Sequence, residues 1–175
     1  TSNTSAGTST ATYSFVGDAN HTSSQSSDTF SIDPATVVVT ADSPSLTYGD
    51  SIPSITYSTS PSTVAGDWTT EPVCSVYSMS DTAFASPLSG VHSAGTYVTH
   101  CSTGTSSNYT TTVVVDGSLT IYKAPSTTVI TCPSAVTYTG SYQTPCSAKV
   151  TGVNGLDTTT TVDYHNNRDT GSGLA

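Results

Sequence analysis

Positive charge is almost absent from this sequence. Lys123, Lys149 and Arg168 are the only lysines and arginines among 175 residues, and the formal net charge is -9. An anionic surface repels phosphate backbones and anionic lipid headgroups. We therefore expect no nucleic-acid partner and no membrane-surface partner, whereas a neutral or cationic partner is open.

Long apolar runs and helical periodicity are also lacking. No apolar stretch approaches the roughly 20 residues that cross a bilayer, so we expect no membrane span in this segment. No window carries a 3.6-residue apolar stripe long enough for a helix. Although serine and threonine make up more than a third of the chain, short segments such as "ATVVVTA", "SLTIYK" and "STTVITC" recur between turn residues. These segments predict strands and an all-β fold.

The four cysteines show no CxxC motif and no Cys/His spacing of a zinc site, which favours disulfides over metal. Cys74 precedes a predicted strand and Cys101 ends another, while Cys132 and Cys146 flank a turn at Gly140. We therefore favour the pairs 74–101 and 132–146, with the other two connectivities open. Disulfides predict an extracellular or cell-surface location. Because the sequence starts with threonine and has no leader, we expect a processed product or an excised segment.

A repeat organises the chain. The stretch at residues 30–49, "FSIDPATVVVTADSPSLTYG", resembles residues 119–140, "LTIYKAPSTTVITCPSAVTYTG". The offset of about 90 residues is the size of one immunoglobulin-like sandwich. We therefore predict tandem immunoglobulin-like modules, with a complete module at residues 34–123, the C-terminal half of a module at residues 1–33, and the N-terminal half of one at residues 124–175.

The flanking segments contain strands that suit only parts of a sandwich. The two ends of the chain, "TSNTSAGTSTA" and "HNNRDTGSGLA", align without a gap and place Asn167 on Asn3. We interpret them as the same strand of one module type, so that the C-terminal piece followed by the N-terminal piece makes one domain. The predicted strands in these segments cover residues 10–16, 29–32, 127–131, 135–139, 147–150 and 158–164.

The central module resembles the MBG class of bacterial immunoglobulin-like repeats. The motifs that carry this resemblance are Tyr-Gly-Asp at residues 48–50, Gly-Thr-Tyr at residues 95–97, Asn-Tyr at residues 108–109 and Gly-Ser-Leu-Thr-Ile at residues 117–121. The two ends resemble halves of a second class of bacterial immunoglobulin-like repeat. Such repeats serve as spacers and adhesive stalks of secreted or surface-anchored proteins, and the resemblance implies a fold and a location but no ligand.

Two functions are consistent with this organisation. In the first, the chain is a structural component of an extracellular filament or surface stalk, and its half-modules are completed by a neighbouring subunit, head to tail, or by adjoining repeats. In the alternative, it is an adhesin-type binding module that recognises a glycan or a surface protein through loops at the end of the sandwich, such as residues 68–71 or 81–88. Trp68, in the loop "AGDWTTEP", is the candidate ligand contact.

Motifs for chemistry are weak or missing. No GxSxG elbow is present, and the histidines sit among turn residues or at strand ends, so we expect no catalytic residue and no enzyme. The Gly-Asp pairs lack the clustered carboxylates that calcium needs, and we expect no metal and no cofactor. Asn3, Asn20 and Asn108 stand in Asn-x-Ser/Thr triplets and are candidate glycosylation sites, although such triplets arise easily by chance in this composition.

Overall fold

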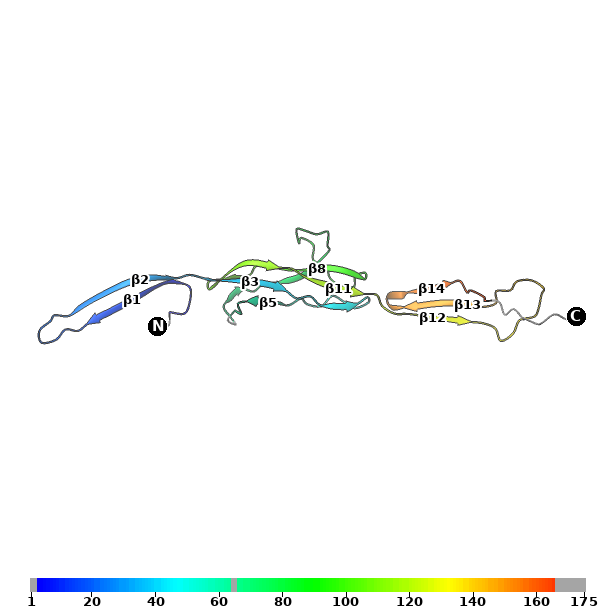
Figure 1. Cartoon of the computed structure of the whole chain (residues 1–175), viewed down its shortest axis with the longest axis horizontal. Helices are drawn as coiled ribbons and strands as arrows, with labels where there is room; N and C mark the ends of the chain where they lie inside the picture. Colours follow the sequence, from blue (N-terminus) through cyan, green and yellow to red (C-terminus); the bar gives the residue numbers. More distant parts are fainter. Residues whose placement is uncertain (1–2, 64–65, 166–175) are drawn as a thin grey trace.

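Three β-structures follow one another along the length of the molecule in a computed structural model, which describes residues 3–63 and 66–165. A two-stranded ribbon lies at the N-terminal end, a two-sheet module in the centre and a three-stranded sheet at the C-terminal end (Figure 1). The described residues form strands and one short 3-10 helix, with no α-helix among them. The predicted all-β class is confirmed.

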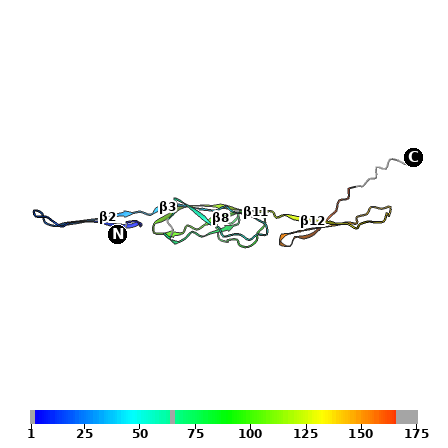
Figure 2. The same cartoon turned by 90° about the horizontal axis from the view of Figure 1, so that it is seen from below.

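The N-terminal ribbon consists of β1 (Gly7–Phe15) and β2 (Ser24–Ile32). The two strands pair antiparallel along their full length, from Gly7 opposite Ile32 to Phe15 opposite Ser24. Both strands are longer than the predicted 10–16 and 29–32, because residues 7–9 before the first and the serine-rich residues 24–28 before the second also find cross-strand partners, although β1 ends at Phe15. Figure 2 shows the ribbon as a single layer, in contrast to the two layers of the central module.

The central module packs two sheets face to face. In the first sheet the order is β10-β3-β5, and β10 runs parallel to β3; in the second the order is β4-β11-β8-β7. A small pair, β6 with β9, lies beside them. The bounds are β3 (Ala35–Ala41), β4 (Ser45–Thr47), β5 (Tyr57–Ser60), β6 (Trp68–Thr70), β7 (Cys74–Tyr77), β8 (Gly95–Cys101), β9 (Thr105–Ser106), β10 (Tyr109–Val115) and β11 (Gly117–Tyr122).

The core of this module lies between the two sheets. Val39 and Ala41 of β3 pack with Cys101 of β8, and Leu119 and Ile121 of β11 pack with further apolar residues of the second sheet. Every second residue of β3 and β11 is buried, as expected for strands with one face in the core of a sandwich. The β-branched residues that predicted these strands therefore supply the buried face.

The C-terminal sheet contains β12 (Ser126–Thr131), β13 (Ser147–Gly152) and β14 (Asp157–Thr160), in that order. A 3-10 helix, η1 (Val153–Gly155), makes the turn between β13 and β14. The predicted strand at residues 158–164 is shorter than expected and ends at Thr160.

The strand predicted at residues 135–139 is wrong. This stretch lies inside the loop that the Cys132–Cys146 disulfide closes, and it has no regular secondary structure. Gln143 donates its side-chain amide to the Thr137 carbonyl at 2.8 Å, so local bonds replace a strand ladder. Tyr138 is 90 % exposed, and a β-rich composition without a partner strand does not make a strand.

Candidate assembly surfaces at the two ends

The N-terminal ribbon has one apolar face and one polar face. Facing residues of an antiparallel pair share a side, and neighbours along a strand alternate. Tyr13 is 74 % exposed and Phe30 is 46 % exposed, and both lie on the apolar face, which is therefore largely uncovered in the described structure. The opposite face carries only serine, threonine and glutamine. The apolar face carries Ala11, Tyr13, Phe15, Phe30 and Ile32.

The ribbon repeats the register of two strands in the second sheet of the central module. The tetrapeptide Ser-Ala-Gly-Thr occurs at residues 5–8, where β1 begins, and at residues 93–96, where β8 begins. In the central module Gly95 stands opposite Ile121 and Tyr97 opposite Leu119. The equivalent pairs of the ribbon are Gly7 with Ile32 and Ser9 with Phe30. The ribbon thus reproduces the pairing of β8 with β11.

The C-terminal sheet is also two-faced. Ile130, Ala148 and Val150 share one face, while the other carries an ion pair between Lys149 and Asp157 at 3.0 Å. Ala148 is 4 % exposed, but Ile130 is 58 % exposed, so much of the apolar face lacks cover among the described residues. A sheet of this kind normally buries that face against a second layer.

This sheet repeats the register of the first sheet of the central module. The strands β3 and β12 each end shortly before a proline, Pro44 and Pro133 respectively, and each pairs antiparallel with the strand that returns. The residue three positions before the proline is Ala41 in β3 and Ile130 in β12. Ala41 stands opposite Tyr57 and Ile130 opposite Ala148, and each pair lies on the apolar side of its sheet.

One edge of the C-terminal sheet is open. In the central module β3 has β5 on one side and β10 on the other, whereas the described strands give β12 only β13. Unpaired N–H and C=O groups along such an edge are a template for an added strand. The edge of β12 therefore corresponds to the place that β10 fills in the complete module.

Both ends are attached to the central module by specific contacts. On the N-terminal side, the Asn108 side-chain oxygen accepts the Ala6 N–H at 2.8 Å, and the Asn108 carbonyl accepts the Ala35 N–H at 2.9 Å. On the C-terminal side, Val153 lies against Gly49, whose φ is +109°. A β-carbon at Gly49 would stand 3.1 Å from Val153 Cγ2. Motif residues of the central module therefore lie at both joints.

Both disulfides join the cysteines that the sequence paired: Cys74 with Cys101 and Cys132 with Cys146. The first links directly opposed residues of β7 and β8, and Cys101 is fully buried. The second closes the loop between β12 and β13. The structure thus holds one bridge in the complete module and one in the C-terminal piece.

Trp68 is half-buried and serves local packing. Its Nε1–H donates to Thr63 Oγ1 at 3.3 Å, and its ring meets that of Tyr109 at 5.9 Å between centroids. A β-carbon on Gly104 would stand 3.0 Å from the Trp68 ring, so the backbone also approaches closely. These contacts account for a tryptophan here without a ligand.

The three candidate glycosylation sites differ in accessibility. Asn108 donates its amide to Asp67 Oδ2 at 3.2 Å and is half-buried, so its nitrogen is engaged in the folded module. Asn3 and Asn20 are exposed. The N–H of Asn20 donates to Asp18, which lowers the pKa of that carboxyl; His21 contributes in the same direction.

The candidate ligand loop at residues 81–88 is folded onto the outer face of the second sheet. Phe84, with φ +51°, stacks on the ring of His100 at 3.7 Å between centroids, and His100 Nδ1 lies 2.6 Å from Asp116 Oδ1. Asp81 accepts backbone N–H groups of the loop, Ser86 first among them, which lowers its pKa. The loop stands out from the module in Figure 1, and only its run of turn residues could have marked it.

Within residues 3–63 and 66–165, no cluster of three or more His, Cys, Asp or Glu side chains is arranged to hold a metal ion. The same residues include no helix that is long and apolar enough to span a membrane.

The described geometry defines the complete module as a disulfide-bridged, two-sheet β-sandwich. Residues 37–120 match the family model of the MBG domain of the YGX type, which confirms the resemblance predicted for the central module. This match is compatible with a structural or an adhesive role in a bacterial surface repeat, and the two disulfides fit an extracellular location. No curated protein and no solved structure matches the chain.

Proposed function

We propose that this chain is a structural element of an extracellular stalk or filament of immunoglobulin-like repeats. Its half-modules are completed by the matching half of an adjoining repeat or of a neighbouring subunit. One observation carries the proposal: the N-terminal ribbon has the register of β8 with β11, whereas the C-terminal sheet has the register of β3 with β5. Each end thus supplies the layer that the other end lacks.

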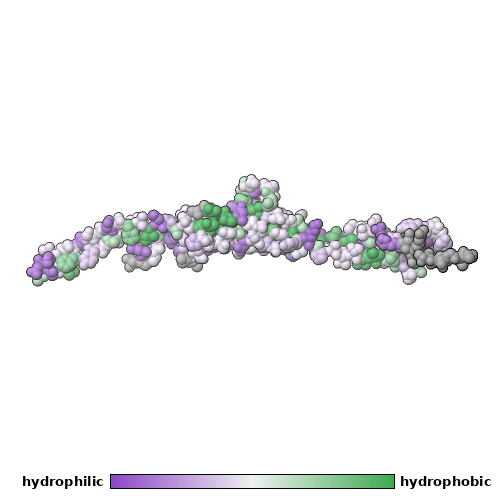
Figure 3. All heavy atoms as spheres, viewed as in Figure 1, coloured by the Kyte–Doolittle hydropathy of each residue, from purple (hydrophilic) through white to green (hydrophobic). Residues whose placement is uncertain are grey.

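The exposed apolar residues give this completion a driving force. Apolar side chains reach the surface at both ends (Figure 3). Fully burying one large apolar side chain that is otherwise exposed stabilises a fold by about 1.5–3 kcal/mol. Because Tyr13, Phe30 and Ile130 are 74 %, 46 % and 58 % exposed, burying what remains of the three contributes about 3–5 kcal/mol before any cost. Association of separate chains costs about 4–15 kcal/mol in lost freedom. Completion is therefore weak between free chains and strong where a covalent linkage keeps the halves together.

The proposal includes no enzymatic activity. The side chains that lie close together are engaged in packing, as at Trp68, or in local hydrogen bonds. The histidine contact with Asp116 involves no serine or cysteine nucleophile of the kind that a triad requires. A binding role for Trp68 is not favoured, because its ring and its N–H both have partners within the module.

A head-to-tail fusion of two full chains tests the proposal. In the fusion, the C-terminal sheet of the first copy and the ribbon of the second copy meet at the junction, while the outer ribbon and the outer sheet are unmatched. We expect amide hydrogens of β12 and β1 at the junction to exchange much more slowly than those of the same strands at the outer ends, as measured by hydrogen exchange and mass spectrometry on a fusion in which one copy is ¹⁵N-labelled by segmental ligation, so that the peptides of the two copies differ in mass.

Matched variants identify the surface responsible. Phe30→Ser in the second copy removes an apolar side chain from the ribbon, and we expect it to abolish the protection at the junction. Thr29→Ser changes the polar face and is expected to leave that protection in place. Equal exchange at the junction and at the outer ends of the unmodified fusion would refute the proposal.

A further inference from the structure

The complete module contains a strand, β10, whose pairing has no counterpart among the described strands of either end. In the central module, β10 runs parallel to β3, with Val114 opposite Val39 and Val115 opposite Thr40. At Asp116 the chain leaves the first sheet and enters the second as β11. β10 therefore closes the edge of β3 and joins the two layers covalently.

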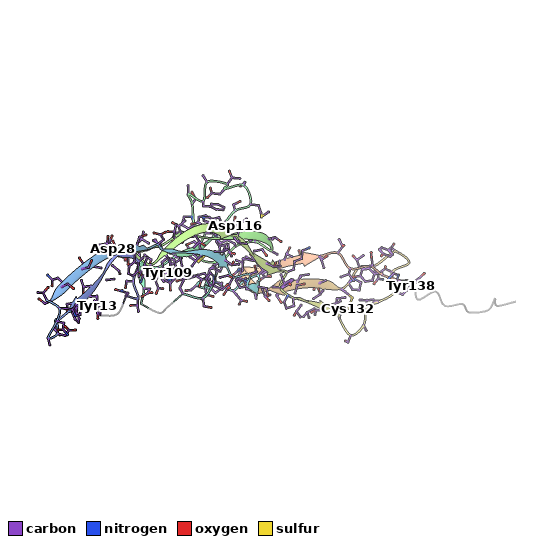
Figure 4. The ribbon with its side chains drawn as sticks, turned by 60° about the vertical axis from the view of Figure 1, so that its left-hand side comes forward. Tyr13, Asp28, Tyr109, Asp116, Cys132 and Tyr138 are labelled. Atoms are coloured by element: carbon purple, nitrogen blue, oxygen red, sulfur yellow. A yellow bond between two sulfur atoms is a disulfide. The ribbon has the colours of Figure 1, made fainter. Side chains whose placement is uncertain are left out.

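The ribbon contains the sequence counterpart of this crossing. The triplet Asn-His-Thr at residues 20–22 matches Asn-Tyr-Thr at residues 108–110, and Asp28 matches Asp116 at the same distance along the chain. Figure 4 shows Asp28 on the ribbon and Asp116 on the central module. By this correspondence, residues 22–27 stand where β10 stands.

These residues are paired differently in the free ribbon. In the central module the pairing of β8 with β11 stops at Thr99 opposite Gly117. In the ribbon Ala11, at the position of Thr99, stands opposite Asp28, because one residue fewer separates Asp28 from Phe30 than separates Asp116 from Leu119. The ladder then continues through four more pairs to Phe15 with Ser24. The hairpin of the ribbon is therefore longer, because it includes residues 24–27. Their counterparts in the central module belong to β10, which pairs with β3 in the first sheet.

We infer that residues 22–27 of the ribbon are an exchangeable strand, of which residues 24–27 pair with β1 in the free chain, and that this strand moves to the open edge of β12 in a second copy. The moved strand runs parallel to β12, as β10 runs parallel to β3. The counterparts of Val114 and Val115 are Ser26 and Ser27, and the counterparts of Val39 and Thr40 are Thr128 and Val129. The register of β10 with β3 therefore places Ser26 opposite Thr128 and Ser27 opposite Val129. This inference rests on the proposed function and specifies the partner and the register of its contact.

The direction of the strands suits linear assembly. In Figure 1, β2 and β12 both run toward the C-terminal end of the molecule. A second copy shifted along the long axis, without being turned over, therefore brings its β2 segment parallel to β12. The faces also agree, because Val114, the counterpart of Ser26, packs against the core of the central module, and Thr128 lies on the apolar side of the C-terminal sheet. A contact of this kind does not close on itself and adds copies in a row.

Cysteine cross-linking between full chains tests the register. Chains with Ser26→Cys are mixed with chains carrying Thr128→Cys, under mild oxidation that leaves the native disulfides intact. Directly opposed residues of neighbouring strands meet the distance that a disulfide requires. We expect a dimer in non-reducing electrophoresis, with the 26–128 bond identified by mass spectrometry. Thr127→Cys is the matched control, because its side chain points to the opposite face, and we expect no dimer with it.

A second variant tests the exchange itself. Thr12 and Ser27 stand opposite each other on the polar face of the free ribbon, so Thr12→Cys combined with Ser27→Cys locks the hairpin extension and leaves the apolar face unchanged. We expect the locked chain to fail to associate with an unmodified chain in sedimentation, whereas Thr12→Ser with Ser26→Cys still cross-links to Thr128→Cys.

The outcomes separate this inference from the proposed function. Equal cross-linking with Thr127→Cys and Thr128→Cys would overturn the register. Head-to-tail association in sedimentation without a 26–128 bond would also overturn it, while leaving the stalk function in place. If no association is observed, the inference that a second copy is the partner would be wrong. The fusion of two chains described above would still test the stalk function independently.

Discussion

The disulfide of the central module offers a prediction whose size follows from the structure. Cys74 and Cys101 are separated by 27 residues in sequence and lie directly opposite each other on β7 and β8. In the chain-entropy description, a crosslink that closes a loop of this length stabilises the fold by about 3.5 kcal/mol. Because Cys101 is fully buried, replacement by alanine also removes core contacts. We expect Cys74→Ala with Cys101→Ala to lose at least that amount.

The assay uses the single tryptophan of the chain. Trp68 lies in the central module and is the only tryptophan in the sequence, so its fluorescence during urea unfolding reports on that module alone. For a domain of this size, a slope of about 1–2 kcal/mol per molar urea converts the loss into a shift of the midpoint by about 2–3 M. Circular dichroism before urea addition checks that the variant is folded.

The second disulfide is the control. Cys132→Ser with Cys146→Ser opens a loop in the C-terminal piece, outside the central module, and we expect it to leave the Trp68 transition nearly unchanged. A midpoint shift below about 0.5 M for the Cys74 and Cys101 variant, given the same slope, would refute the assignment of this stability to the bridge. An equal shift for both variants would refute the independence of the two pieces.

Three further predictions concern the same module. Gly117→Ala places a β-carbon 2.6 Å from the Ala41 carbonyl oxygen, and the overpacking is expected to cost about 1–3 kcal/mol in the fluorescence assay; an unchanged midpoint would contradict it. The carboxylate of Asp81 has a folded pKa below its ordinary value of 3.8, chiefly because of the Ser86 N–H, so its stabilisation of the loop is fully present above that value and is lost as the pH falls through the folded pKa. Protection of the Ser86 amide, measured as its exchange rate relative to the intrinsic rate at each pH, should therefore fall only at such acidic pH, and a loss of protection near neutral pH would contradict this reasoning. In force spectroscopy, reduction of the Cys74–Cys101 bridge should lengthen the unfolded module by about 90–100 Å, at about 3.5 Å per released residue, and an equal length in both redox states would exclude the bridge.

The sequence predicted the strands that bury a regular pattern of β-branched residues. β3 and β11 follow from "ATVVVTA" and "SLTIYK", because alternate residues of these segments enter the core. The stretch at residues 135–139 has a similar composition but no partner strand within reach, and it forms a loop. Composition therefore predicts which residues suit a strand, whereas pairing depends on neighbours that lie elsewhere in the chain.

The contacts at the candidate site depended on register, which composition does not reveal. The repeat predicted that the ends are parts of modules, but not that β1 with β2 has the pairing of β8 with β11. The stack of Phe84 on His100 was equally out of reach, because it requires a long loop to fold back onto the sheet. The disulfide pairs were predictable because each bridges positions that adjoining strands bring together.

The division of the chain into a closed centre and open ends has a physical logic. The central module holds its layers together by a continuous core and a covalent bridge, so it keeps its fold whether or not a neighbour is present. The ends have few buried residues of their own, and nearly every apolar side chain of the ribbon is exposed or half-exposed. A segment with little to lose in the free state can change its pairing at low cost, because the strand bonds given up on one edge are replaced by bonds on another. The end segments bury too little apolar surface to form stable modules by themselves, but their exposed apolar faces and open edge suit contact with a neighbour. For this reason we assign assembly to these weakly packed parts of the fold.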